Sequence, residues 1–461
     1  MAYHKVGNYS FQWTDLHMSP EKLNPLRHQH DQLGSYAVNK LQQISREQKG
    51  DAAAAEVSLC HGPFDVYATL RDHYAEDEKL NQLWEELYTV PEWVDWEQLK
   101  RGQRFFYRYA AANLVGFALQ GFIGQNSSTP SAVEVLARTR SFSTRVLLRR
   151  LLETTQFILE ATESVEAIQP GGHGHTTAVR VRLLHSAVRE RILKLTEKQR
   201  GYFDVKNLGI PVNMLDSIHS TAAFCCGHLW FQLPQMGVYP TQQEAADYVA
   251  LWRYLGYLQG VPDGYFSSVA QAKATMESMV LHELKLTPTS LIVGHNFVKC
   301  VKDLPPVMIS AGFIEAGSRM LNGHEVCDGL GFGRPGPLAY ACWRGHCWFV
   351  GALALVQQWI PAVDEAMVAY WRKTLNYGVF NSKGGLQGGS KMEFKYVPQL
   401  GKTTKREDNG RAALGSFVTS PLGRPLETFY FAVFVIGCLL ICGSLFGVYW
   451  GARKTMVEYV W

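Results

Sequence analysis

Cysteines are few in this sequence, and their spacing matches no common metal or redox motif. The 461 residues contain nine cysteines, and no two of them stand as Cys-x-x-Cys. This excludes a disulfide-dense scaffold, a zinc ribbon and a thioredoxin-type redox site. Cys342 and Cys347 flank a histidine in the aromatic stretch CWRGHCW, which we interpret as part of a packed helix.

Charge of either sign is also scarce. The chain has 45 Lys and Arg against 41 Asp and Glu, a net charge of +4, which is too small and too dispersed for a nucleic-acid partner. Apolar residues make up 47% and aromatic residues 12% of the chain, which excludes a disordered or low-complexity protein. The composition therefore predicts a folded protein with a sizeable core.

Long apolar runs are absent except near the C-terminus. The first residues lack the apolar run of a secretory signal. Residues 428–449 contain no charge, and a helix of that length spans the roughly 30 Å of a bilayer core. We predict a single transmembrane helix at residues 428–449 with a short tail at 450–461. We further expect tail-anchored insertion into the endoplasmic reticulum membrane, with the body in the cytosol.

The remaining sequence is mainly helical in its periodicity, and alternating β-branched runs are nearly absent. This favours an all-α body of ten or more helices. We predict an irregular N-terminal extension at residues 1–55 that packs on a body at 56–373, and a polar Gly- and Lys-rich tether at 374–427. The apolar run at 110–124 is too short for a second span and predicts a buried helix.

The stretch at residues 141–165 predicts a helix with polar groups beside its apolar stripe. Arg150, Glu153, Thr154 and Phe157 stand at positions i, i+3, i+4 and i+7, so they share one helix face. Polar groups on a mostly buried face cost free energy unless partners satisfy them. We therefore expect this face to meet a partner or a bound group.

A second helix is predicted at residues 176–195, and His185 lies on its apolar stripe. The stripe also holds Val181, Val188 and Ile192, so the imidazole points towards the core. Alone, an inward histidine is usually structural, but a neutral imidazole facing the polar helix before it would suit a planar metal cofactor. Six arginines flank the two helices and face either solvent or cofactor carboxylates: Arg138, Arg140, Arg145, Arg180, Arg182 and Arg189.

These motifs together resemble a known family. Arg150-x-x-x-Thr154, followed by VRVRLLHSAVR around His185, resembles the catalytic domain shared by the rubber oxygenase (latex clearing protein) and the ER-bound oxygenase MpaB of the mycophenolic acid pathway. Two further stretches of sequence support the resemblance: VPEWVDWEQLKRGQRFFYRYA, which begins at Val90, and GIPVNMLDSIHSTAAF, which begins at Gly209. The resemblance extends over about residues 60–370.

The resemblance implies a globin-like helical domain that binds haem b, with His185 as the proximal iron ligand. It further implies that Arg150 and Thr154 line the distal side and that Glu134 is a catalytic base near the haem. The rubber oxygenase has a distal lysine one position before the threonine, whereas this chain has Glu153. We therefore expect Glu153 beside the cofactor and an iron whose sixth position is open or water-bound.

The function implied is that of a membrane-anchored oxygenase that uses dioxygen to cleave a carbon–carbon double bond in an apolar, isoprenoid-like metabolite. A haem monooxygenase or peroxidase-like enzyme on another lipophilic metabolite would use the same residues, and so would a membrane-tethered haem-binding protein without turnover. A non-haem metal site at His173 and His175 is a further alternative, based on their HxH spacing in a Gly-rich turn.

Overall fold

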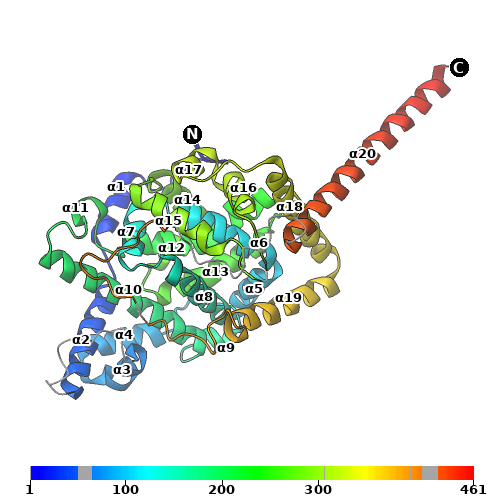
Figure 1. The fold of residues 1–461 in the computed structure, drawn as a ribbon. Helices are drawn as coiled ribbons and strands as arrows, with labels where there is room; N and C mark the ends of the chain where they lie inside the picture. The colour runs from blue at the N-terminus through cyan, green and yellow to red at the C-terminus, as the bar shows by residue number, and fades with distance from the viewer. Residues whose placement is uncertain (1, 50–64, 306, 394–395, 408–423, 461) are drawn as a thin grey trace.

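The computed structural model describes residues 2–49, 65–305, 307–393, 396–407 and 424–460. Helices make up a large body, and one long helix projects from it (Figure 1). The described residues contain one two-stranded sheet. The prediction of an all-α fold is thus confirmed.

The N-terminal third begins with a hairpin and continues as helices. Its elements are β1 (Tyr3–Val6), β2 (Tyr9–Gln12), α1 (Pro20–Leu23), the 3-10 helix η1 (Asn24–His28), α2 (Gln32–Lys49), α3 (Val66–His73), η3 (Tyr74–Glu76) and α4 (Glu78–Tyr88). In Figure 1, α2, α3 and α4 lie together at the end of the body remote from α20 (Pro425–Val460).

The middle of the chain forms most of the core. Its elements are α5 (Trp96–Arg108), α6 (Ala110–Gly116), the π-helix η4 (Phe117–Asn126), α7 (Pro130–Arg138), α8 (Thr144–Ala161), α9 (Val165–Ile168), α10 (His173–Lys198), α11 (Val205–Leu208), α12 (Met214–Cys226), η5 (Gly227–Gln232), η6 (Pro234–Met236) and α13 (Gln242–Leu258). The apolar run at 110–124 is therefore a buried helix, as predicted, and it changes to π-helical winding at Phe117.

The last third covers the core and ends in the projecting helix. It comprises η7 (Asp263–Phe266), α14 (Val269–His282), α15 (Pro288–Val301), α16 (Ala311–Asn322), α17 (His324–Gly329), α18 (Pro337–Trp359), α19 (Pro361–Asn376), η8 (Tyr377–Asn381) and α20. Cys342 and Cys347 are buried in α18, so the interpretation of their stretch as a packed helix is confirmed.

We expected the first twelve residues to be irregular, but they form the β1–β2 hairpin. Gly7 adopts a φ of 56°, the positive value that a two-residue hairpin turn requires. The hairpin packs on α14, where the Tyr9 hydroxyl donates to Glu277 Oε1 at 2.6 Å. Four-residue strands are too short to produce a clear alternating pattern in the sequence.

The segment predicted to be a free tether is held on the body over residues 374–393 and 396–407, where hydrogen bonds join it to neighbouring helices. Gln156 Nε2 donates to the carbonyl of Ser390 at 2.9 Å, and Asn296 Nδ2 donates to that of Lys405 at 2.7 Å. Polar and Gly-rich composition indicates a loop, but it does not distinguish a loop held by hydrogen bonds from a free one. Residues 408–423 of the predicted tether lie outside the described residues.

Helix α20 contains the predicted membrane segment and extends beyond it to Val460. Residues Pro425–Trp450 are long and apolar enough to cross a membrane, and within the described residues this is the one such helix. Its first turns pack on α18, where a Cβ added at Gly345 would overlap the carbonyl oxygen of Tyr430. Gly345 therefore allows the two helices to approach closely.

Candidate functional site

A cavity with an empty volume of about 1540 Å³, part of it open to solvent, lies between α7, α8, α10, α12 and α13. This volume includes the open space at the mouth of the cavity as well as the enclosed space. Aromatic and aliphatic side chains form much of its wall: Phe122, Phe142, Leu147, Leu151, Phe157, Val181, Val188, Phe224 and Trp252.

His185 projects from α10 into this cavity. Val181 and Val188 line the cavity beside it, as the predicted stripe requires, whereas Ile192 is buried outside the cavity. The imidazole has accessible surface, but that surface faces the interior space, and the surrounding protein desolvates the ring. This burial, together with the charges of Arg189 and Arg150, lowers the pKa of His185 to about 4.

His185 is therefore neutral at pH 7 and has an unshared electron pair on one ring nitrogen. Among the described residues, none forms a hydrogen bond with its imidazole. A neutral imidazole that no described residue bonds, at the wall of a large cavity, could bind a metal ion through this electron pair.

The predicted polar face of α8 borders the same cavity. Arg150, Glu153, Thr154 and Phe157 all line it. Thr154 Oγ1 donates to the carbonyl oxygen of Arg150 at 3.0 Å, so its hydroxyl offers acceptor lone pairs to the cavity. The structure thus brings the α8 face and His185 to one site.

Glu153 is buried and fully engaged by donors. It accepts from Arg149 Nε at 3.1 Å, from Arg150 Nη1 at 3.0 Å and from Ser390 Oγ at 2.8 Å. Two guanidinium groups thus compensate the charge of a carboxylate that has little contact with solvent. These contacts make Glu153 a group that holds Arg150 in place.

Glu134, which the resemblance placed near the cofactor, does not line the cavity. Its carboxylate accepts from Arg138 Nη1 and from Thr289 Oγ1 of α15. Its neighbour Val135 does face the cavity, and one residue corresponds to a rotation of about 100° around a helix. In this structure Glu134 thus does not reach the cavity, and its role beside a cofactor stays a prediction.

The six flanking arginines do not line the cavity either. Arg182 is buried in ion pairs with Asp31 and Glu86, and Arg189 Nη2 donates to the carbonyl of Val212 at 2.8 Å. Arg180 and Arg138 also pair within the protein. These contacts assign four of the six arginines to ion pairs and hydrogen bonds of the fold and not to cofactor carboxylates.

The two histidines of the Gly-rich turn do not converge on a metal site. His173 pairs with Glu163 at the surface. His175 is buried, and its Nε2 donates to the carbonyl of Leu87 at 2.8 Å while Nδ1 accepts from the Gly171 amide at 3.4 Å. Both nitrogens of His175 are thus used, and no group of three or more His, Cys, Asp or Glu side chains in the described ranges could hold a metal ion.

Asp216 of α12 is a cavity residue that our sequence analysis did not single out. Ser131 Oγ donates to its Oδ1, whereas its buried Oδ2 has no hydrogen-bond partner. Burial raises the pKa of Asp216 to about 7, although Ser131 and Arg27 act in the opposite direction. Ser220, one turn later in α12, lines the cavity too. The i, i+4 spacing of Asp216 and Ser220 is therefore the feature of the sequence that could have indicated a polar helix face here.

Substituting Asp216→Asn is expected to stabilise the protein more at pH 8 than at pH 5. Because the folded pKa is raised from 3.8 to about 7, the folded state retains a proton that the unfolded chain loses between these values. The wild type therefore loses stability as the pH rises through this range, by on the order of 4 kcal/mol at most. Denaturant titrations of both proteins at pH 5 and 8 measure the difference.

The exposed Asp72, which pairs only with Arg71 at the surface, provides the control for that experiment. Asp72→Asn is expected to change stability equally at pH 5 and pH 8. A stability gain for Asp216→Asn that does not grow with pH would contradict the raised pKa.

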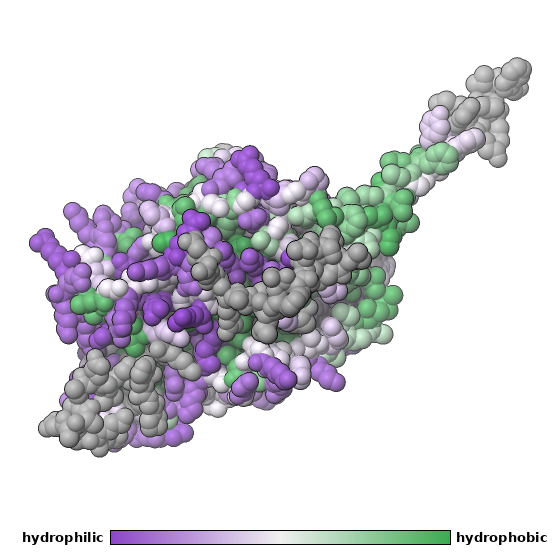
Figure 2. All heavy atoms as spheres, in the orientation of Figure 1, coloured by the Kyte–Doolittle hydropathy of each residue, from purple (hydrophilic) through white to green (hydrophobic). Residues whose placement is uncertain are grey.

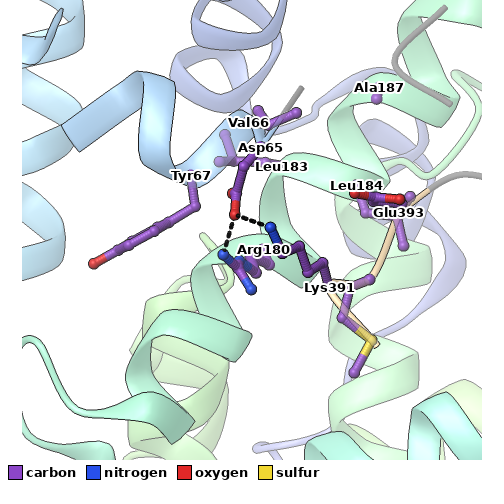
Figure 3. Close-up of a pocket in the computed structure, with 10 residues that line it drawn as sticks. Asp65, Val66, Tyr67, Arg180, Leu183, Leu184, Ala187, Lys391 and Glu393 are labelled. Atoms are coloured by element: carbon purple, nitrogen blue, oxygen red, sulfur yellow. Dashed lines mark hydrogen bonds and ion pairs between the residues drawn. The ribbon is translucent and has the colours of Figure 1, made fainter. Parts of the chain in front are cut away.

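Residues Ser390, Lys391 and Met392 form a strap at one side of the cavity. Lys391 Nζ and Arg180 Nη2 meet Asp65 Oδ2 at 3.4 and 2.6 Å in a small outer pocket, which Figure 3 shows. Leu184 and Met392 line both this outer pocket and the central cavity. The strap therefore separates the cavity from the surface at this point.

Comparison with known proteins finds similar sequences over the part of the chain that contains this cavity. The sequence model of the family described as "ER-bound oxygenase mpaB/B'/Rubber oxygenase, catalytic domain" matches residues 106–352. A rubber oxygenase from Streptomyces sp. (strain K30) is 26% identical over 263 residues, which cover 55% of this chain and 61% of that relative. The match thus spans less than two thirds of the relative's length.

The solved structure of the latex clearing protein LCP in the closed state has a similar fold. It superposes with a TM-score of 0.53 and 18% sequence identity, covering 76% of this chain and 91% of that chain. The family match includes α8 and α10, which carry Arg150, Thr154 and His185. The chain belongs to the family of the ER-bound oxygenase MpaB and rubber oxygenase catalytic domain.

Proposed function

We propose that this protein is a haem b-dependent oxygenase anchored in a membrane, and that it cleaves a carbon–carbon double bond of a lipophilic, isoprenoid-like metabolite. One observation carries the proposal: a neutral, unbonded His185 and the cationic Arg150 border the same large cavity. Similarity to a protein named rubber oxygenase supports the reaction class. The apolar helix α20 supports a membrane location, which we place at the endoplasmic reticulum.

The cavity residues have distinct roles in this proposal. His185 provides the electron pair that holds the haem iron, and bound haem supplies the redox chemistry with dioxygen. Arg150, held by Glu153 at 3.0 Å, presents positive charge and hydrogen-bond donors to developing negative charge on oxygen. Thr154 offers acceptor lone pairs beside it, because its proton is donated to the helix backbone.

The walls of the cavity fit an apolar substrate. Phe122, Phe224 and Trp252 contribute aromatic surface, and Leu147 and Leu151 contribute aliphatic surface. Such walls bind a hydrocarbon chain through its apolar area and exclude water from the reacting carbons. A substrate of this kind also partitions into a bilayer, which brings it to a membrane-anchored enzyme.

Substituting Arg150→Ala is expected to leave haem content unchanged while turnover falls by roughly 10²-fold or more, as with the loss of other preorganised hydrogen-bond donors. The measurement pairs the absorption spectrum of the purified protein with an assay of an oligo-isoprenoid substrate under air. Loss of haem in Arg150→Ala would show instead that the arginine acts in cofactor retention.

Glu134→Gln is the matched control, because Glu134 carries charge near the site but does not line the cavity. We expect its turnover to stay within about threefold of the wild type, since hydrogen bonds from Arg138 and Thr289 occupy the carboxylate. A loss as large as that of Arg150→Ala would restore Glu134 as a catalytic group.

The products distinguish the proposed cleavage from the monooxygenase or peroxidase-like alternative. Cleavage of a double bond by dioxygen gives two carbonyl fragments that share the carbon atoms of the substrate. A product that keeps the full carbon chain and gains a hydroxyl group or an epoxide would favour the monooxygenase alternative. Mass spectrometry of the reaction under ¹⁸O₂ reports both the fragment sizes and the number of oxygen atoms incorporated.

A further inference from the structure

The C-terminal half of α18 and the start of α19 lack charge. Residues 345–363 contain no Asp, Glu, Lys or Arg, although they form a surface helix and the turn after it. At the junction, Leu355, Val356, Trp359 and Ile360 are 58%, 42%, 80% and 48% exposed, respectively. We call these four residues the α18–α19 corner.

The four residues of the α18–α19 corner form one continuous exposed face. They stand at positions i, i+1, i+4 and i+5, which share one side of a helix and its end. Single exposed apolar residues are common on soluble proteins, but a cluster that includes a largely exposed tryptophan indicates an interaction surface. The charged residues nearest in sequence, Arg344 and Asp364, lie outside the corner.

The corner is continuous with α20. Trp348 of α18 stacks on Phe434 at 5.3 Å between ring centroids, and Phe349 contacts Phe429 at 5.1 Å. Gly345 also meets Tyr430, and Gly437 of α20 meets Trp348, so the middle of α18 packs closely along the first turns of α20. The C-terminal half of α18 therefore lies on the side of the body from which the apolar part of α20 emerges.

The surface view supports this continuity. Figure 2 shows the hydrophobic surface of α20 extending at its base onto the adjoining side of the body, while hydrophilic residues dominate much of the rest of that view. Tyr370 of α19 and Tyr377 at the start of η8 are also exposed. Tryptophan and tyrosine are the side chains that favour the interface between lipid and water.

We propose that the α18–α19 corner inserts into the lipid bilayer beside α20, so that the body is embedded in one leaflet in addition to being anchored. This inference rests on the proposed membrane location of α20. The partner is a phospholipid bilayer, because the exposed face is apolar, is ended by an aromatic residue and continues the surface of a candidate span. Burial of four large apolar side chains in lipid stabilises this orientation of the body.

The test uses the full chain in phosphatidylcholine nanodiscs, with a photo-cross-linking phenylalanine derivative placed at single positions. Trp359 is the test position, and Leu439 in α20 is the positive control. Lys206 in α11 is the negative control, because it is exposed and Figure 1 shows α11 at the opposite end of the body from α20. After irradiation, mass spectrometry measures lipid attached to the protein.

We expect lipid adducts at positions 359 and 439 and at least tenfold less at position 206. If lipid adducts form at position 439 but are no more abundant at position 359 than at position 206, the insertion of the corner is overturned, whereas the membrane location of α20 is retained. No adduct at 439 would overturn the membrane location itself. A protein–protein adduct at 359 in place of lipid would show that a second copy covers the corner, and would also overturn the proposal.

Ile360 provides a second position should the variant at 359 fold poorly, because it is exposed in the same corner. The two positions are expected to give the same result. If position 439 forms lipid adducts but neither position 359 nor position 360 does, the proposal is overturned, and poor folding of one variant cannot explain the result.

Discussion

His185→Ala is expected to lower the haem content of the purified protein at least tenfold. The imidazole is neutral, is not bonded by a described residue and borders the cavity, so the substitution removes the proposed iron ligand while breaking few contacts within the protein. The haem-to-protein ratio from the reduced pyridine complex measures the effect. The melting temperature of the cofactor-free protein should change by no more than about 2 °C, because an exposed cavity group contributes little packing.

His219 is the appropriate control for this experiment. As with His185, desolvation lowers the pKa of His219 to about 4. However, its Nε2 lies 3.1 Å from Gln125 Oε1, and it does not line the cavity. His219→Gln should retain haem, and an equal haem content in the wild type and His185→Ala would contradict the assignment of the iron ligand.

Arg182→Ala is expected to reduce the free energy of unfolding by roughly 3–5 kcal/mol, the range for breaking a buried ion pair by removing one partner. The guanidinium is almost fully buried and donates to both carboxylate oxygens of Asp31, at 2.8 and 2.9 Å, and to Glu86 at 2.7 Å. Its removal leaves Asp31 buried without its main counter-charge. Guanidinium denaturation followed by circular dichroism measures the loss.

Two further variants show whether this loss comes from the unpaired carboxylate. Adding Asp31→Asn to Arg182→Ala should recover part of the stability, since it removes the uncompensated charge. Arg71→Ala, which breaks the exposed pair with Asp72, should cost less than about 1 kcal/mol. An Arg182→Ala loss as small as that of Arg71→Ala would show that the buried pair contributes little.

The loss of unfolding free energy in Arg182→Ala depends on pH because the partner of Arg182, Asp31, is titratable. The Arg182 charge and its hydrogen bonds hold the pKa of Asp31 below its ordinary value despite burial. The stabilisation is therefore present above the unfolded pKa of about 4 and is lost as the pH falls through the lower folded pKa. The difference between the wild type and Arg182→Ala should accordingly narrow in strongly acidic solution.

The two helices of the site could be predicted from the sequence because side-chain spacing alone determines which residues share a helix face. Arg150, Glu153, Thr154 and Phe157 line the cavity together for this reason. The partners of Glu153 could not be predicted, because Ser390 lies 237 positions away. A contact at that separation depends on how the polar segment after α19 folds back over α8.

Glu134 and Asp216 show the limit of reasoning from single helices. The family resemblance places Glu134 near the cofactor, but the rotation of α7 on its neighbours directs Val135 into the cavity instead. Asp216 has an ordinary sequence context, two residues after the start of α12. Its one side-chain partner, Ser131 of α7, lies 85 positions away, and no local pattern contains that contact.

The strap has a practical consequence for making a soluble version of this protein by removing α20. Ser390 belongs to the chain that leads towards α20, yet it donates to Glu153 at the cavity. Truncation before residue 390 would remove that donor and the side chain of Met392 from the cavity wall. Glu407 still contacts Thr144 at the start of α8, so truncation immediately after Glu407 removes α20 while keeping every residue that lines the cavity.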